Sequence, residues 1–152
     1  MPVEVSVRPR RPSVKAARVR AAAQATLDAE GAGDLAVSVV VVSDGALHAL
    51  NRDWLGHDHP TDVISFKLRE DGDPDPLLGE VVVSADRAAA EAAARGIDFE
   101  EELLRYVVHG CLHLLGYDDA RPRARARMRG RQEEILRGVR GRVRGRGGGR
   151  RR

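Results

Sequence analysis

Two histidines one helical turn apart, His109 and His113, followed by Gly116 and Asp119, constrain this chain more than any other feature. An α-helix turns once in about 3.6 residues, so both imidazoles project from one face and can reach one ion. Gly116 accepts a positive φ at low cost, so it can end the helix and turn the chain back. Asp119 can then complete a three-ligand site, which is the arrangement of a catalytic zinc with an open fourth position.

The residues around this motif leave some alternatives open. Imidazole and carboxylate ligands favour one Zn²⁺ per chain, with manganese, iron or nickel as alternatives because of the oxygen ligand. Asp118 is an alternative to Asp119 as the third ligand. Cys111 points to another helix face than the histidines, so it is interpreted as a small buried apolar residue. Gly110 stands where H-E-x-x-H zinc peptidases carry a glutamate base, which disfavours a peptidase.

The composition predicts one domain with an aliphatic core. The chain has 152 residues, of which 42% are hydrophobic and only 3% aromatic. It contains no apolar run of the roughly 20 residues that a membrane helix needs, and no apolar segment stands at its start. A single cysteine fits a reducing compartment. We therefore expect a cytoplasmic protein with no membrane partner.

Positive charge is concentrated at the C-terminal end. Residues 1–120 carry a net charge of −9, and residues 121–152 carry +12. The Arg/Gly-rich segment 138–152 is predicted to be a disordered basic tail after a domain at 1–137. Such a tail would attract RNA phosphates that the acidic body repels, although it could instead only solubilise the protein or tether it to the ribosome. The arginines predicted to bind RNA are Arg140, Arg142, Arg144 and Arg146.

Hydrophobic periodicity predicts four strands and about five helices. The strands are expected at 3–7, 35–42, 61–68 and 78–84. The helices are expected at 13–30, 44–54, 85–95, 99–115 and 122–137. This order predicts a single α+β domain, with a roughly four-stranded mixed sheet and the metal site at the end of a central helix.

Three blocks of the sequence resemble the bacterial endoribonuclease YbeY family. The segment Thr61–Phe66 resembles the TDVLSF segment of the family, and Leu78–Ser84 resembles its LGDIVIS strand. The segment His109–Asp119 resembles its H-G-x-L-H-L-x-G-Y-D-H signature. The order and spacing of the blocks agree, and the resemblance covers roughly residues 35–137.

The resemblance implies a zinc-dependent, single-strand-specific endoribonuclease that acts in maturation of the 16S ribosomal RNA 3′ end and in ribosome quality control. It implies ribosomal RNA, the small ribosomal subunit, a small-subunit ribosomal protein and the GTPase Era as partners. Carried over by position, His109, His113 and Asp119 are the metal ligands. The family usually has histidine as its third ligand. It also has an arginine at the position of Leu55, for which Arg52 is a candidate substitute.

The expected reaction is attack of metal-activated water on a phosphodiester. Asp118 and Glu80 are the candidate catalytic residues that accept the proton. Two other functions are kept as alternatives: a metal-dependent peptidase, and a non-catalytic ribosome assembly factor in which the metal only fixes the helix to the following loop.

Overall fold

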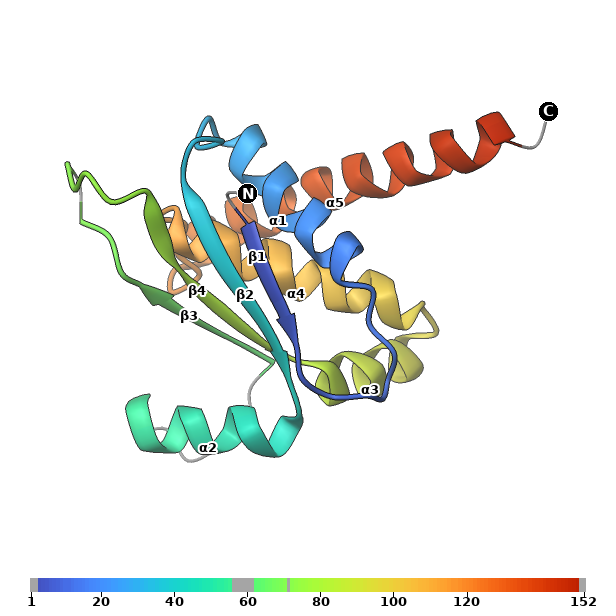
Figure 1. Cartoon of the computed structure of the whole chain (residues 1–152), viewed down its shortest axis with the longest axis horizontal. Helices are drawn as coiled ribbons and strands as arrows, with labels where there is room; N and C mark the ends of the chain where they lie inside the picture. Colours follow the sequence, from blue (N-terminus) through green and yellow to red (C-terminus); the bar gives the residue numbers. More distant parts are fainter. Residues whose placement is uncertain (1–2, 56–61, 71, 151–152) are drawn as a thin grey trace.

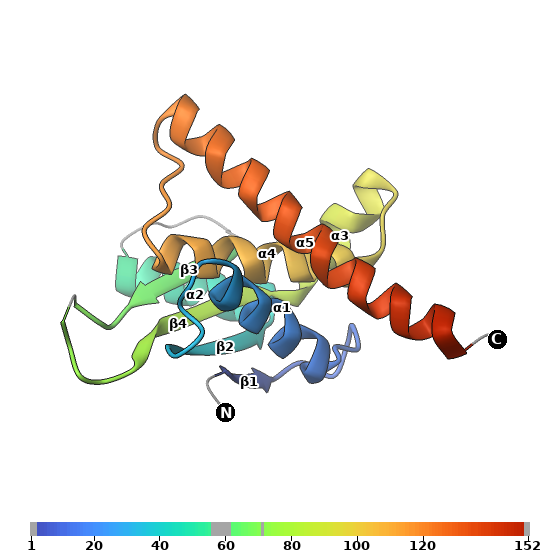
Figure 2. The ribbon, with the colours of Figure 1, turned by 90° about the horizontal axis from the view of Figure 1, so that it is seen from above.

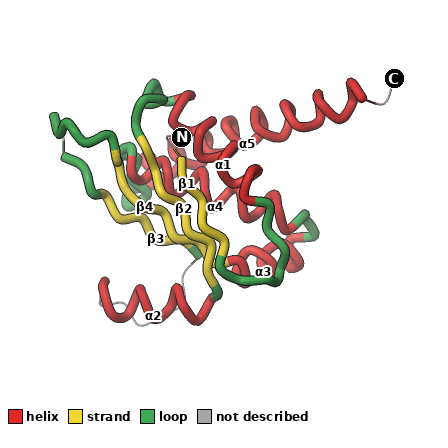
Figure 3. Tube along the Cα trace, viewed as in Figure 1, coloured by secondary structure: helices red, strands yellow, loops and turns green. Residues whose placement is uncertain are grey.

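Four strands form one mixed sheet in the order β1-β2-β4-β3 (Figures 1 and 3). The computed structural model describes residues 3–55, 62–70 and 72–150. The strands are Val3–Val7 (β1), Ala36–Val42 (β2), Val63–Lys67 (β3) and Leu77–Ser84 (β4). β1 and β4 are both parallel to β2, whereas β3 is antiparallel to β4. The predicted four-stranded mixed sheet is confirmed.

The helices lie on both faces of this sheet. They are Ala16–Ala29 (α1), Asp44–Leu55 (α2), Ala85–Arg95 (α3), Phe99–Leu114 (α4) and Pro122–Arg150 (α5). α1 and α4 cover one face with α5 lying across α4, and α2 lies on the other face (Figures 1 and 2). The predicted single α+β domain is confirmed. None of the helices in the described ranges has the length and apolar character to cross a bilayer.

The central strands are apolar on both faces because helices cover both of them. In β2, Val39 and Val41 pack in the core with α1 and α4, whereas Val40 and Val42 pack in a second cluster with Leu47 of α2. β1 is an edge strand, and it alternates as a half-covered strand should. Its Val3 is buried, while Glu4 and Ser6 are exposed.

α4 lies at the centre of the larger core and positions the C-terminal residues of the helix. It packs against α1, α3, α5 and the strands β3 and β4. Its buried apolar side chains include Leu103, Leu104, Val107, Val108 and Leu112. Helix packing on several sides leaves α4 little freedom to rotate or slide, so the side chains on its remaining face are held in fixed positions.

α5 is longer than the sequence predicts. The helix was expected to end near Arg137 and to be followed by a disordered tail at 138–152, but α5 continues to Arg150. Core packing extends past the expected end, because Val139 is buried and Arg140 pairs with Glu101 of α4 at 2.9 Å. Arginine is also a good helix former, which the composition-based prediction of disorder neglected. The last turns extend away from the rest of the molecule (Figure 2).

Candidate metal centre

Two histidines on one face of α4 form the base of the site. His109 and His113 are one turn apart, and their ring centroids are separated by 4.8 Å. Both side chains are partly exposed, at 28% for His109 and 31% for His113. The rings therefore lie at the surface of a helix whose other faces are buried, where an ion can reach them.

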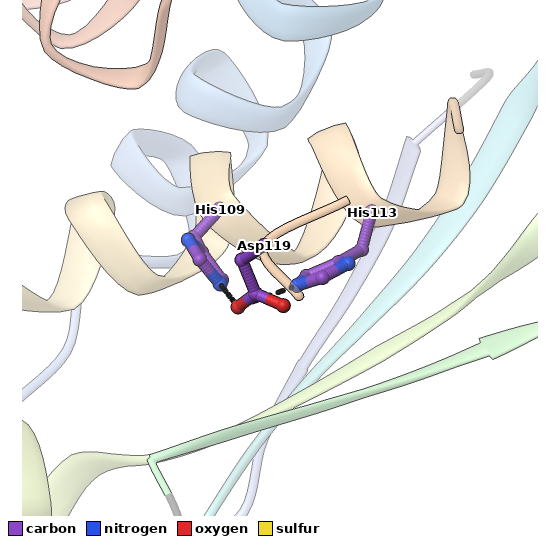
Figure 4. A group of neighbouring side chains, drawn as sticks. All are labelled: His109, His113 and Asp119. Atoms are coloured by element: carbon purple, nitrogen blue, oxygen red, sulfur yellow. Dashed lines mark ion pairs between the residues drawn. The ribbon is translucent and has the colours of Figure 1, made fainter. Parts of the chain in front are cut away.

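The turn after α4 returns an aspartate to the histidines. Gly116 adopts a φ of +102°, and the amide of Tyr117 donates to the carbonyl of Leu112 at 3.0 Å. This closes the helix end in the way that a glycine with a positive φ allows. The Asp119 carboxylate then lies between the two imidazoles (Figure 4). Its Oδ2 is 3.8 Å from Nε2 of His109 and 3.4 Å from Nε2 of His113.

These three groups fit a metal ion. One ligand atom from each of His109, His113 and Asp119 lies within 4.8 Å of the others. Two ligands at about 2.1 Å from a tetrahedral ion are separated by roughly 3.4 Å, close to the distances between the histidine nitrogens and the carboxylate. Two imidazoles and one carboxylate are a donor set of catalytic zinc sites. The sequence-predicted ligands are brought together.

Gln132 of α5 orients His109. The Nδ1 atom of His109 donates to Oε1 of Gln132 at 2.7 Å, which leaves Nε2 free to face Asp119. Burial lowers the pKa of His109 below its ordinary value, although the hydrogen bond to Gln132 opposes this. The neutral imidazole, which is the form that binds metal, is thereby favoured.

A chain of ionic contacts holds Gln132 in place. Its Nε2 donates to Glu133 at 3.0 Å, and Arg105 of α4 binds both carboxylate oxygens of Glu133, at 2.8 and 3.0 Å. The hydrogen bond from Arg105 lowers the pKa of Glu133, so this carboxylate is held in its charged form. Arg105 also bonds to Glu102, which is buried. The α4–α5 contact therefore fixes the partner of His109.

Replacing Gln132 by leucine is expected to weaken zinc binding by about 10- to 100-fold, because an outer partner that orients a histidine ligand is lost. Leucine fills a similar buried volume, so the melting temperature should change little. Gln132→Glu keeps an acceptor for Nδ1 and is the matched control. Competition with a chromophoric chelator measures the affinity, and equal affinities for Gln132→Leu and the unaltered protein would contradict the assignment.

The sequence analysis missed Gln132, although a signal was present. Gln132 is four residues after Met128 and three before Ile135, so it lies on the stripe of α5 that these buried residues define. A polar side chain on a buried stripe needs a hydrogen-bonding partner. The identity of that partner depends on how α4 and α5 pack.

Gly110 is where α4 comes closest to the sheet. A Cβ atom at this position would lie 2.5 Å from Cγ1 of Val81 and 3.1 Å from Cγ2 of Val63. The hydroxyl of Ser65 donates to the carbonyl of Gly110 at 3.0 Å, which ties the helix to β3. The glycine that replaces the usual peptidase glutamate is thus required by packing.

A cavity of about 450 Å³ opens beside the two histidines, between α4 and β3. Its polar lining includes Asp62, Ser65 and Lys67 as well as Asn51 of α2. Asp62 acts on His109 electrostatically, although it was not predicted as a site residue. The cavity thus holds an acid, a cation and the three metal-binding groups together.

The structure does not bring the two predicted proton acceptors to the histidines. Asp118 is exposed, and its carboxylate accepts from the amide of Ala120 at 2.9 Å. Glu80 lies on β4, which is a central strand and not the edge strand expected for it. Because Val81 faces α4, strand alternation turns Glu80 to the opposite face of the sheet.

Other predicted residues lie apart from the metal group or outside the described part. Arg140 pairs with Glu101, and the side chains of Arg142, Arg144 and Arg146 lie outside the described residues. The side chain of Leu55, at the end of α2, also lies outside them. Cys111 is fully buried, and burial raises the pKa of its thiol to about 12, which fits the small apolar role predicted for it.

The fold and this group define an α+β domain that can hold a metal ion at the edge of an open cavity. The family model of the endoribonuclease YbeY matches residues 5–140. The chain belongs to the YbeY family, and this family is one of endoribonucleases.

Individual relatives agree with the family model. An endoribonuclease YbeY of Anaeromyxobacter is 46% identical over 122 residues, which are 80% of this chain and 64% of that relative. An endoribonuclease YbeY of Thermus thermophilus is 42% identical over 136 residues, 88% of this chain and 98% of its own. A solution structure of a Thermotoga maritima protein, 29% identical, superposes with a TM-score of 0.68 over 95% of this chain and 93% of that one.

Proposed function

We propose that this chain is a zinc-dependent endoribonuclease that hydrolyses phosphodiesters of single-stranded RNA. The observation that carries the proposal is the convergence of His109, His113 and Asp119 at the edge of an open polar cavity. Family membership supplies the substrate class, because the matching relatives are named endoribonucleases.

The biological setting follows from the same resemblance. We place the activity in maturation of the 16S ribosomal RNA 3′ end and in ribosome quality control, in the cytoplasm. The proposed partners are ribosomal RNA, the small ribosomal subunit with one of its proteins, and the GTPase Era. The excess of arginine in residues 121–152 supports a nucleic-acid partner, because arginine binds phosphate in a bidentate manner.

The residues of the cavity suggest how the reaction is divided among them. A metal ion held by the three ligands would polarise a phosphate oxygen and acidify water. Asp62 is the acid that lines the cavity with both histidines, so we assign proton acceptance to Asp62 in place of Asp118 and Glu80. Lys67 lines the same cavity and can bind a phosphate oxygen as a point charge.

A peptidase fits this site less well. The metal peptidases of the H-E-x-x-H type need a glutamate directly after the first histidine. Here that position is Gly110, whose Cβ position is occupied by Val81 of the sheet. A glutamate could not be introduced without moving α4 away from β4.

Removing the metal and restoring it tests the proposal. Protein treated with a chelator and dialysed should lose cleavage of single-stranded RNA, and one equivalent of zinc should restore it. Duplex RNA of the same sequence and casein are the comparison substrates, and neither should be cut. Cleavage that survives chelation, or casein hydrolysis at a similar rate, would overturn the proposal. Metal binding without any RNA cleavage would favour the assembly-factor alternative.

A further inference from the structure

A second hollow adjoins the metal group on the side of α5. It has a volume of about 210 Å³ and is lined by His109, Asp119, Gln132 and three α5 residues. These three are Arg125, Met128 and Arg129. His109 and Asp119 also line the larger cavity beside β3. The metal group therefore separates two openings and is accessible from both.

The two arginines of this hollow carry positive charge that the protein does not neutralise with a carboxylate. Both are exposed, and they are one helical turn apart on α5. Arg125 donates from Nε to the backbone carbonyl of Asp119 at 3.1 Å, which leaves its terminal amino groups available. Arg129 makes no hydrogen bond or ion pair with any residue that the structure describes.

Other arginines at the α5 interface are paired with acids. Arg131 binds Glu30 and Glu134, and Arg105 binds Glu133. The unpaired cations thus lie beside the metal group, where they are free to bind an external anion. The opposite cavity contains Asp62, so the local charge differs between the two openings.

We propose that the α5-side hollow binds a phosphodiester of the RNA strand next to the one that is cut, an inference that rests on the proposed function. The guanidinium groups of Arg125 and Arg129 bind the phosphate oxygens, since a planar guanidinium matches the geometry of a phosphate. The strand then passes His109 and Asp119 and enters the cavity beside β3. A single strand suits this path, because the phosphates are contacted without reading base edges.

Charge-matched double variants test the assignment. Arg125→Gln with Arg129→Gln removes the two cations of the hollow. Arg123→Gln with Arg127→Gln removes two exposed arginines of the same spacing from the other side of α5, since residues two apart project in nearly opposite directions. The probe is a short 2′-O-methyl oligoribonucleotide that resists cleavage. Its affinity is measured by fluorescence anisotropy over a range of salt concentrations.

The expected result is a change in salt dependence that only the first pair produces. Each lost phosphate contact on a single strand lowers the slope of log affinity against log salt by about 0.7, so two lost contacts lower it by about 1.4. An equal decrease in both pairs would show diffuse attraction along α5 and overturn the assignment. An unchanged slope in the first pair would do the same.

Two further measurements separate this inference from other effects. Arg125 also holds the loop of Asp119, so Arg129→Gln alone, with its zinc content measured, must lower the slope while keeping the metal. Inorganic phosphate is the second probe. If it binds the unaltered protein and not the first pair, while the oligoribonucleotide slope stays the same, the hollow takes a free anion and the strand assignment is wrong. The proposed function is tested independently, by zinc-dependent cleavage in the unaltered chain.

Discussion

Replacing His113 by alanine is expected to abolish RNA cleavage and stoichiometric zinc binding, while the protein stays folded. His113 supplies one of the three converging groups, so only two ligands would remain. The loss in zinc affinity should exceed the about 10- to 100-fold that removal of an outer partner costs. The imidazole is partly exposed, so its removal leaves no cavity in the core.

The measurement combines elemental mass spectrometry, a cleavage assay and a thermal melt of each protein without metal. Asp119→Ala and Asp118→Ala form the matched pair, because the two acids are adjacent but only Asp119 lies beside the histidines. Asp119→Ala should behave as His113→Ala, and Asp118→Ala should retain its zinc. Zinc retained in Asp119→Ala and lost in Asp118→Ala would reverse the assignment of the third ligand. Equal cleavage by all variants would point to a contaminating nuclease.

The metal ligands were predictable from the sequence because their geometry is local. Two histidines four residues apart must share a face of any helix, and the sequence correctly predicts a helix through both. The return of Asp119 depends on a short turn whose glycine is visible in the sequence. No contact between distant segments is needed to bring these three residues together.

The other site residues depend on packing between distant segments. Asp62 and Glu80 are both acids near predicted strands, and only the register of β3 and β4 decides which one faces α4. Ser65 of β3 lies opposite Val81 of β4, and both face Gly110. Glu80 is therefore turned away, whereas Asp62 lines the cavity at the end of β3. Periodicity gives the alternation within each strand but not the face that meets α4.

A methyl group at Gly110 is expected to destabilise the protein, although alanine is the better helix former. The added Cβ would lie 2.5 Å from Val81, which is fully buried and cannot move into solvent. Overpacking of this kind costs about 1–3 kcal/mol, and the gain in helix propensity of about 1 kcal/mol offsets only part of it. Each kcal/mol corresponds to about 2–4 °C in the melting temperature.

A double-mutant cycle identifies Val81 as the cause. Gly110→Ala, Val81→Ala and the double variant are compared by denaturant unfolding. Val81→Ala alone should be destabilising because it leaves a cavity, and the double variant should be more stable than the sum of the single effects predicts. Strict additivity would show that the two residues do not meet. Gly130→Ala on exposed α5, where a Cβ meets nothing within 4 Å, is the control and should stabilise by about 0.5–1 kcal/mol.

The same variants connect packing to the metal group. Gly110 directly follows His109, so any shift of α4 away from β4 moves the imidazole relative to Asp119 and Gln132. Gly110→Ala should therefore lower zinc affinity as well as stability, and Val81→Ala in the same chain should recover part of both. Recovery of stability without recovery of zinc affinity would mean that the close approach of α4 to the sheet serves folding alone. Recovery of both would show that this approach also sets the distance between the ligands.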